Sequence, residues 1–158
     1  ATAGGGNSLT VTAVGWGYTR NGGTPSAILQ QVTLDYVPND ECDAKEDRGV
    51  SYQGEISDNM LCTFAVGKDT CYGDSGGPIL LDDENIFAVQ GVQVGIVSWG
   101  PDQCADDVFP GVSMRVSSGY DWIRQWVCAI DGGSNNQGGT STNAPDEYQC
   151  DSDATYSP

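Results

Sequence analysis

Histidine is missing from this 158-residue chain, and basic residues are scarce. Six lysines and arginines stand against 22 aspartates and glutamates, so the formal net charge is −16. A surface of that sign repels polyphosphate, which excludes nucleic acid and anionic membranes as partners. The composition favours a solvated, salt-tolerant surface as the explanation of this acidity.

Long apolar runs are also missing, since none approaches the ~20 residues needed to cross a bilayer. The chain begins with Ala1 rather than Met and shows no charged and apolar leader, so we expect that a signal peptide has already been removed. There is no Cys-x-x-Cys pair, and without histidine the cysteines make a poor zinc site. The even count therefore predicts three disulfides, an extracellular location, and no metal or organic cofactor. The six residues are Cys42, Cys62, Cys71, Cys104, Cys128 and Cys150.

Twenty-two glycines and seven prolines in short spacings favour strands and tight turns. Alternating or continuous apolar patterns predict strands at residues 9–13, 29–37, 60–65, 79–81, 87–99 and 108–116. A short helix is expected after Pro38, and a second one near Ser118 with apolar residues at helical spacing up to Ile130. These elements predict an all-β domain over 1–130, either an antiparallel barrel or a sandwich, with a terminal helix. Residues 131–158 are rich in Gly, Ser and Asn and predict a tail held by Cys150.

The segment Asp69-Thr70-Cys71-Tyr72-Gly73-Asp74-Ser75-Gly76-Gly77-Pro78 carries the chemistry. A serine between an acid and two glycines, beside a cysteine, is a typical setting for a nucleophilic hydroxyl. At its free pKa a serine hydroxyl is a weak nucleophile and needs an adjacent base. Because the chain has no histidine, that base must come from outside these 158 residues.

Neighbouring motifs sharpen this interpretation. Ser98-Trp99-Gly100 follows an apolar strand, Cys104 comes four residues after Gly100, and Phe109-Pro110-Gly111-Val112 comes next, while Trp16-Gly17 precedes them all. In this order the motifs resemble the chymotrypsin-family (trypsin-like) serine proteases, and specifically the second of their two β-barrels. The resemblance runs from about Val11 to Val127. It implies a six-stranded antiparallel β-barrel followed by a C-terminal α-helix.

The resemblance implies roles for the nucleophile loop. Ser75 matches the nucleophile, and the backbone N–H groups of Gly73 and Ser75 match the oxyanion hole. Asp74 matches the buried acid that pairs with an N-terminal ammonium freed when a zymogen is cleaved. An unpaired buried carboxylate is costly, which explains how cleavage can switch such a site.

The resemblance also implies a pocket for a basic side chain of the substrate. Asp69 matches the floor of the primary specificity pocket, where a carboxylate selects Arg or Lys. Gly100 and Gly111 match the walls of this pocket. The main chains of Ser98 and Gly100 match groups that pair with a substrate strand, and Trp99 would pack beside that strand. The acids of the following loop either add negative potential at the entrance or are simply solvated, and we favour the second. They are Asp102, Asp106 and Asp107.

Two disulfides of the family match Cys42–Cys62 and Cys71–Cys104. A third is missing, and its positions align with Val11 and Leu81, an apolar pair that can fill the same space. Cys128 and Cys150 lie outside the common pattern and are expected to bond to each other. The alternative is that one of them bonds to another chain.

The sequence departs from the family where the first barrel should be. That barrel supplies the histidine, the orienting aspartate and the N-terminus that engages the buried acid, and none of them occurs here. Three explanations compete: a C-terminal cleavage product still held by its N-terminal half, a part of a longer protein, or an inactive homologue recruited for binding. Ser113 also replaces the tyrosine that trypsins usually have below the pocket, which affects its depth and wetness.

The expected function is therefore the C-terminal half of a secreted serine endopeptidase, made as a zymogen, that cleaves after Arg or Lys through an acyl-enzyme on Ser75. Its expected partners are an N-terminal half carrying His and Asp, and protein substrates with Arg or Lys. The alternative is a catalytically inactive homologue that serves as a binding module. The acidic run Asp82-Asp83-Glu84 is either a weak cation site or, as we favour, a solvated turn. In a protease of this specificity, few basic residues also leave few points for self-cleavage.

Overall fold

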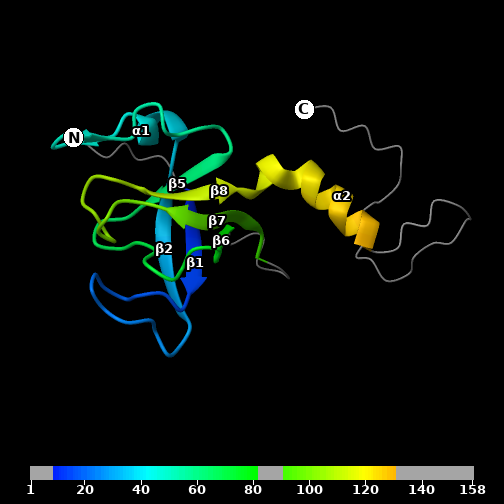
Figure 1. Ribbon diagram of the computed structural model, residues 1–158, viewed down its shortest axis with the longest axis horizontal. Helices are drawn as coiled ribbons and strands as arrows, with labels where there is room; N and C mark the ends of the chain where they lie inside the picture. The colour runs from blue at the N-terminus through cyan, green and yellow to red at the C-terminus, as the bar shows by residue number, and fades with distance from the viewer. Residues whose placement is uncertain (1–8, 82–90, 131–158) are drawn as a thin grey trace, which may run out of the picture. The chain divides into compact units, whose positions relative to one another are not determined.

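The computed structural model describes residues 9–81 and 91–130 (Figure 1). It divides into two compact units, residues 1–118 and 119–158, which are described separately. The first unit is a closed barrel with strand order β1-β2-β5-β8-β7-β6, in which all neighbouring strands are antiparallel. The predicted six-stranded barrel is confirmed, and the alternative of a sandwich is wrong. The strands are β1 Thr10–Gly15, β2 Gln30–Val37, β5 Met60–Phe64, β6 Pro78–Leu81, β7 Gln93–Trp99 and β8 Gly111–Arg115.

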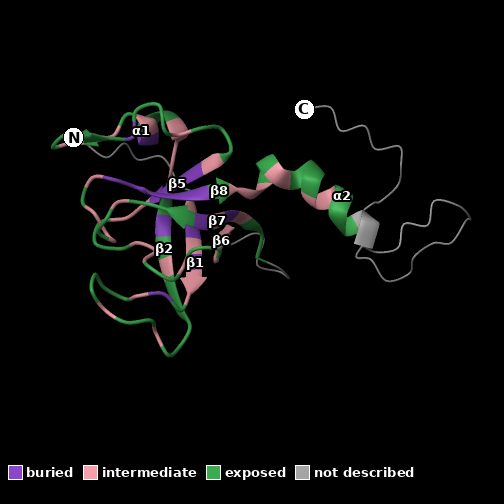
Figure 2. Cartoon of the chain, viewed as in Figure 1, coloured by how far each residue is buried: buried purple, intermediate pink, exposed green. Residues whose placement is uncertain are grey.

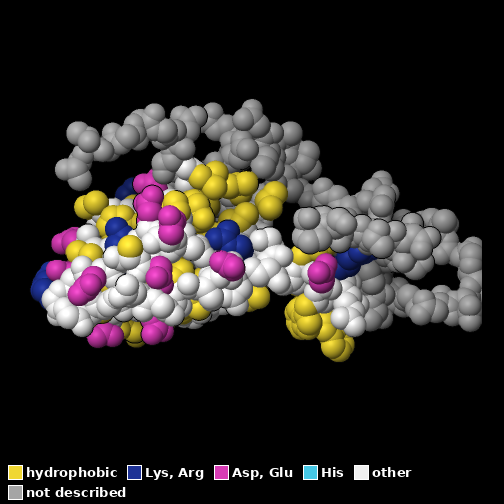
Figure 3. All heavy atoms as spheres, turned by 90° about the horizontal axis from the view of Figure 1, so that it is seen from above, with side chains coloured by type: hydrophobic (Ala, Val, Ile, Leu, Met, Phe, Trp, Pro, Cys, Tyr) yellow, Lys and Arg dark blue, Asp and Glu magenta, His cyan; other side chains and the backbone are white. Residues whose placement is uncertain are grey.

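The barrel interior is filled by the apolar residues that alternate along these strands. Buried segments concentrate on the barrel strands in Figure 2. On β2, Leu34 is buried and Val32 and Tyr36 pack against the same cluster, as their alternation predicted. Acidic side chains are dispersed over the face of the barrel seen in Figure 3, as expected for a solvated surface. The central cluster consists of Val11, Ala13, Leu34, Leu61, Ile79 and Val97.

Val11 and Leu81 are direct partners across the β1–β6 ladder. Val11 is buried and Leu81 packs against the central cluster. Facing residues of an antiparallel pair have Cβ atoms about 4.5–5.5 Å apart, so an apolar pair can occupy the place of a cross-strand disulfide. Val11 and Leu81 thus face each other, as their expected equivalence to the two positions of the third family disulfide requires.

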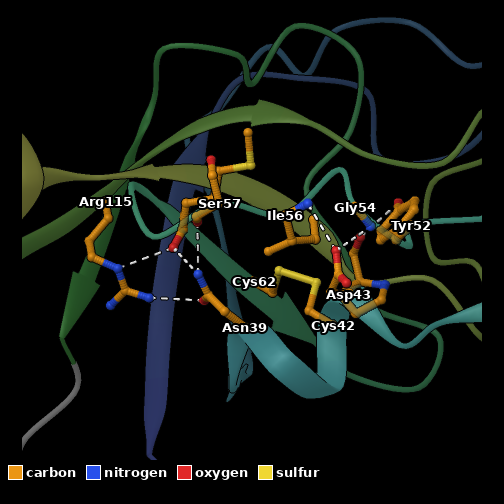
Figure 4. Close-up of a disulfide and its surroundings, with 11 residues drawn as sticks. Asn39, Cys42, Asp43, Tyr52, Gly54, Ile56, Ser57, Cys62 and Arg115 are labelled. Carbon is orange, nitrogen blue, oxygen red and sulfur yellow. Dashed lines mark hydrogen bonds between the residues drawn. A yellow bond between two sulfur atoms is a disulfide. The ribbon is translucent and has the colours of Figure 1, made fainter.

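A second apolar cluster lies under the helix α1, Asn39–Asp43, which carries Cys42. The disulfide Cys42–Cys62 joins α1 to β5, with the Cα atoms 6.4 Å apart (Figure 4). In the same figure Arg115 donates to the side chain of Asn39 at 3.0 Å, and Asn39 donates to the carbonyls of Ser57 and Met60. Side chains of α1 and β8 therefore hold the loop that enters β5. The second cluster contains Cys42, Tyr52, Cys62, Phe109 and Val112.

The sequence did not predict the hairpin of β3, Glu46–Asp47, and β4, Val50–Ser51. Each strand has only two residues, too few for an alternating pattern to be visible. The turn between them places Arg48 at φ 49° and Gly49 at φ 84°. Asp43 anchors the chain that follows, because its carboxylate accepts the N–H groups of Gly54 and Ile56 at 2.8 and 3.2 Å (Figure 4).

Replacing Cys42 and Cys62 together by alanine should lower the free energy of unfolding by about 3 kcal/mol, because the bridge closes a loop of 20 residues in the unfolded chain. Urea unfolding followed by tryptophan fluorescence measures this difference. Both sulfurs are fully buried, so a small additional loss from the vacated volume is expected. An unchanged unfolding midpoint would show that the bridge does not stabilise the barrel.

The second unit contains α2, Tyr120–Ile130, which follows a 3-10 turn at Val116–Gly119. Ser118, the expected capping residue, lies within that turn, and α2 begins two residues after it. The rings of Trp122 and Trp126 lie 6.3 Å apart on one face of α2, as the i, i+4 spacing predicts. No helix among the described residues is long and apolar enough to span a membrane.

Several predictions concern residues that the structure does not describe. They are the tail over 131–158 with Cys150, the acidic run at 82–84, and the part of the expected strand 87–99 that precedes Gly91. The pairing of Cys128 with Cys150 stays a prediction for the same reason. So does the domain boundary at residue 130.

Candidate active site

The loop between Cys71 and Pro78 turns sharply around the predicted nucleophile. Gly73 and Gly76 have φ angles of 92° and 84°, a region that residues with a Cβ rarely adopt. The N–H of Gly76 donates to Val97 at 2.8 Å, which ties the loop to β7. Ser75 lies between these two glycines and is exposed. Within the described residues, the N–H groups of Gly73 and Ser75 bond to no acceptor, so both are available to a ligand.

Asp74 is partly buried, and its side chain turns toward the chain that leaves β1. Its carboxylate accepts the N–H of Gly17 at 2.8 Å and that of Cys71 at 2.9 Å. A Cβ on Gly15 or Gly17 would collide with this carboxylate. The glycines on both sides of Trp16 therefore make room for the acid. Sequence reasoning missed this role, although the pattern Gly-Trp-Gly was a visible signal.

Trp16 itself lies outside the core. Trp16 is 59% exposed and so does not contribute to either buried cluster. Beside it, a cavity of about 440 Å³ is lined by Asp74 together with Gly15, Gly17 and residues of β2. This cavity gives a polar group of another segment access to the carboxylate of Asp74.

A second cavity, of about 280 Å³, brings together most of the residues predicted to bind substrate. Asp69 and Ser75 both line it, although they come from opposite sides of the Cys71 corner. Gly111 is buried, and a Cβ there would lie 2.9 Å from the carboxylate of Asp69. Glycine at this wall therefore keeps the acid accessible. The predicted residues that line the cavity are Asp69, Ser75, Ser98, Trp99, Gly100 and Gly111.

Asp69 is a partly buried carboxylate whose two oxygens are both engaged. One accepts the N–H of Thr70 at 2.8 Å, and the other accepts the N–H of Ala105 at 3.0 Å. Burial raises the pKa of Asp69, the two backbone N–H donors oppose that shift, and the charges of Asp106 and Asp74 add to it. The described residues place no cation on Asp69. An acid desolvated in this way gains most from a cationic ligand, because the ligand supplies the missing counter-charge.

Tyr52 supports the wall of this cavity from behind. Its ring packs against Trp99 at 5.1 Å and against Phe109 at 4.8 Å, and its hydroxyl donates to the carbonyl of Pro110 at 3.1 Å. Burial, followed by the charges of Asp69 and Asp106, raises the pKa of Tyr52 to about 12. The hydroxyl therefore remains a donor at physiological pH. No local motif pointed to Tyr52, because its partners Trp99, Phe109 and Pro110 lie about 50 to 60 residues further along the chain.

The acids of the loop after Trp99 differ in what they do. Asp106 accepts the N–H groups of Val108 and Phe109 at 2.8 and 2.9 Å, and these bonds lower its pKa. It is thus a turn-stabilising residue. Asp102 lines the cavity of Asp69 and is exposed at its rim, whereas Asp107 is exposed and lines no cavity described above.

Ser113 and Cys104 complete the surroundings of the cavity. Ser113 is 3% exposed on β8 and does not line the cavity, whose boundary on that strand is Gly111. The disulfide Cys71–Cys104, with Cα atoms 5.3 Å apart, links the nucleophile loop to the opposite wall. Both disulfides implied by the family resemblance are therefore present. No group of three potential metal ligands occurs among the residues that the structure describes.

A comparison of the sequence with models of protein families agrees with these features. The family model described as Trypsin matches residues 5–123, which is most of the chain. The chain belongs to the trypsin family.

Individual relatives agree with this assignment. Trypsin, alkaline B, of Manduca sexta is 41% identical over 122 residues, which cover 75% of this chain and 43% of that protein. Trypsin-1 of Astacus astacus is 41% identical over 116 residues, covering 72% and 45%. Venom serine protease 34 of Apis mellifera is 40% identical over 113 residues, covering 72% and 25%. The chain thus spans less than half the length of these trypsin-family relatives.

Proposed function

We propose that this chain is the C-terminal half of a secreted serine endopeptidase that cleaves peptide bonds after Arg or Lys. The observation that carries the proposal is the cavity of about 280 Å³ that Asp69 and Ser75 share. A long basic side chain that reaches Asp69 from the cavity mouth leaves its carbonyl carbon near Ser75. A desolvated acid at one end and a hydroxyl at the other suit the hydrolysis of a bond next to a cation.

The chemistry follows from these groups. The Ser75 hydroxyl attacks the carbonyl carbon after Arg or Lys, and the backbone N–H groups of Gly73 and Ser75 stabilise the negative charge on the carbonyl oxygen. A histidine takes the serine proton and returns it to the leaving amine, and an aspartate orients that histidine. Water then releases the acyl group from Ser75. The main chains of Ser98 and Gly100 pair with the substrate strand, and Trp99 packs beside it.

The histidine must come from another segment, because these 158 residues contain no histidine, and we propose that the orienting aspartate comes with it. The proposed source is an N-terminal half, either on a second chain or on a preceding part of the same protein. Activation of a zymogen would bring a new N-terminal ammonium to Asp74, through the cavity of about 440 Å³ that this carboxylate lines. Secretion is supported by the two disulfides, which persist in oxidising compartments.

A fluorophosphonate probe tests this proposal on the native protein. Labelling at Ser75, found by peptide mapping and prevented by benzamidine, supports an endopeptidase with a pocket for a basic residue. Cleavage of a mixed peptide library only after Arg and Lys completes the assignment. Masses with and without a reductant identify a histidine-containing partner chain. A folded protein that binds benzamidine yet never reacts with the probe is instead an inactive homologue that serves as a binding module.

The affinity of the pocket for a cation should fall at acidic pH, starting above the usual range of an aspartate. Burial raises the pKa of Asp69, so the carboxyl takes up its proton at a higher pH and loses its attraction for an amidinium. The same shift favours the protonated folded state, so its contribution to stability is present at low pH and is lost as the pH rises through the raised pKa. Fluorescence titration with p-aminobenzamidine from pH 3 to 8 measures the midpoint.

Asp107→Asn is the matched control for this titration, since Asp107 belongs to the same loop, is exposed, and is not among the charges that raise the pKa of Asp69. The control should leave the midpoint of the binding curve in place. A midpoint at or below the ordinary aspartate value in the wild-type protein would contradict the prediction.

A further inference from the structure

Tyr72 bridges the mouth of the Asp69 cavity. It precedes Gly73 on the nucleophile loop, and its hydroxyl donates to the carbonyl of Asp102 at 2.7 Å. Asp102 belongs to the opposite wall, and both residues line the cavity that holds Asp69 and Ser75. The side chain therefore connects the two rims of the entrance, although the residues are 30 positions apart.

The backbone and ring of Tyr72 are held in place as well as its hydroxyl. Its carbonyl accepts the N–H of Tyr18 at 2.8 Å, and its ring meets the ring of Tyr18 edge-on at 6.1 Å. A side chain that is 55% exposed would otherwise sample several rotamers. The contacts with Tyr18 restrict it to the direction of Asp102.

The wall segment that Tyr72 reaches has few other attachments. Cys104 is fixed by its disulfide and by Asn21, whose side chain donates to the Cys104 carbonyl at 3.1 Å and accepts its N–H at 2.8 Å. Gly100 lies at the other end, next to β7. For residues 101–103 between them, the bond from Tyr72 is the one hydrogen bond that the described structure shows.

We propose that Tyr72 is a positioning residue for substrate specificity: its hydroxyl holds the wall at residues 100–104 against the nucleophile loop and so sets the width of the pocket entrance. The inference rests on the proposed function, since it concerns the binding of a basic side chain to Asp69. With this bond in place, the entrance of the Asp69 cavity admits a slender basic side chain of the substrate, and Gly100 stays in position beside that side chain. Without the bond the wall moves away from the bound side chain, and affinity falls.

Tyr72→Phe in the complete protease, this chain together with the segment that supplies its histidine, tests the inference. Fluorescence titration should show the Kd of p-aminobenzamidine raised about three- to tenfold, the usual range for one hydrogen bond. KM for an arginine amide should rise to a similar extent with kcat little changed. The second-order rate of fluorophosphonate labelling should stay within about twofold, because that reaction needs Ser75 and the oxyanion N–H groups but not the pocket wall.

Tyr18→Phe is the matched control, since it removes a hydroxyl from the other ring of the pair and keeps both rings. It should leave the Kd near the wild-type value, whereas Asn21→Ala, which frees Cys104 from its side-chain clamp, should raise it. A wild-type Kd in Tyr72→Phe would overturn the inference, and so would an equal loss of labelling and binding, which would place the effect on the oxyanion loop. A wild-type protein that binds no p-aminobenzamidine overturns the proposed pocket itself, and with it this role of Tyr72.

Discussion

Replacing Ser75 by alanine is expected to abolish peptide hydrolysis, with kcat falling on the order of 10⁶-fold when the histidine-bearing segment is present. The reason is chemical: Ser75 is the proposed nucleophile, and it lines the same cavity as Asp69. Hydrolysis of an arginine amide measures the loss, and fluorophosphonate labelling should disappear with it. The exposed Ser117 provides a control, since Ser117→Ala should change neither.

The same variant separates chemistry from binding. Ser75→Ala leaves Asp69 and both glycine walls intact, so the Kd of p-aminobenzamidine should stay within about twofold of the wild-type value. Retained hydrolysis would show that Ser75 is not the nucleophile. Loss of benzamidine binding together with activity would show that the substitution had collapsed the loop rather than removed one reacting group.

Asp69→Asn is expected to have the second largest effect. It should lower kcat/KM for arginine and lysine substrates by about 10²–10³-fold, because the bound cation would lose its buried counter-charge. Asparagine preserves the volume and one acceptor, but its amide nitrogen must face the N–H of either Thr70 or Ala105. Initial rates on matched arginine and leucine amides measure the change, and only the arginine rate should fall steeply.

Asp106→Asn is the control for the rate measurement, because the Oδ1 that accepts two backbone N–H groups can be kept by the amide oxygen. It should alter the arginine rate by less than about threefold, as expected for a mostly solvated charge. Equal losses of rate in both variants would mean that the substrate responds to the total negative charge of these acids, and that Asp69 does not select the basic side chain by itself. Labelling of Ser75 in Asp69→Asn should persist, since the probe needs no cation pocket.

The fold was largely predictable, because barrel strands leave a short-range pattern in the sequence. Val32, Leu34 and Tyr36 alternate with polar residues, and their burial follows from the two-residue period of a strand. The hairpin at Glu46–Ser51 left no such pattern, since its strands are only two residues long. The helix α2 begins two residues after Ser118, the expected capping residue, because a 3-10 turn precedes it and takes up Ser118.

The site was predictable where a single loop carries it and hidden where distant loops meet. Ser75 stands within a compact motif, and the sequence named it directly. Tyr52 acts through Trp99, Phe109 and Pro110, which follow it by roughly 50 residues or more, and Tyr72 acts through Asp102. Contacts of that range leave no periodicity in one sequence, so no local pattern could assign either tyrosine a role.

The amino-acid sequence by itself determined the family, the barrel strands and, through the family resemblance, the pairing of four cysteines, and it supplies no histidine as a base for Ser75. Only the tertiary structure decided that Asp69 and Ser75 share one cavity, that glycines on both sides of Trp16 accommodate Asp74, and that the Tyr72 hydroxyl reaches the carbonyl of Asp102. Barrel closure accounts for this division. It brings the loop after β5 and the loop after β7 to the same end of the barrel, where they meet through side chains.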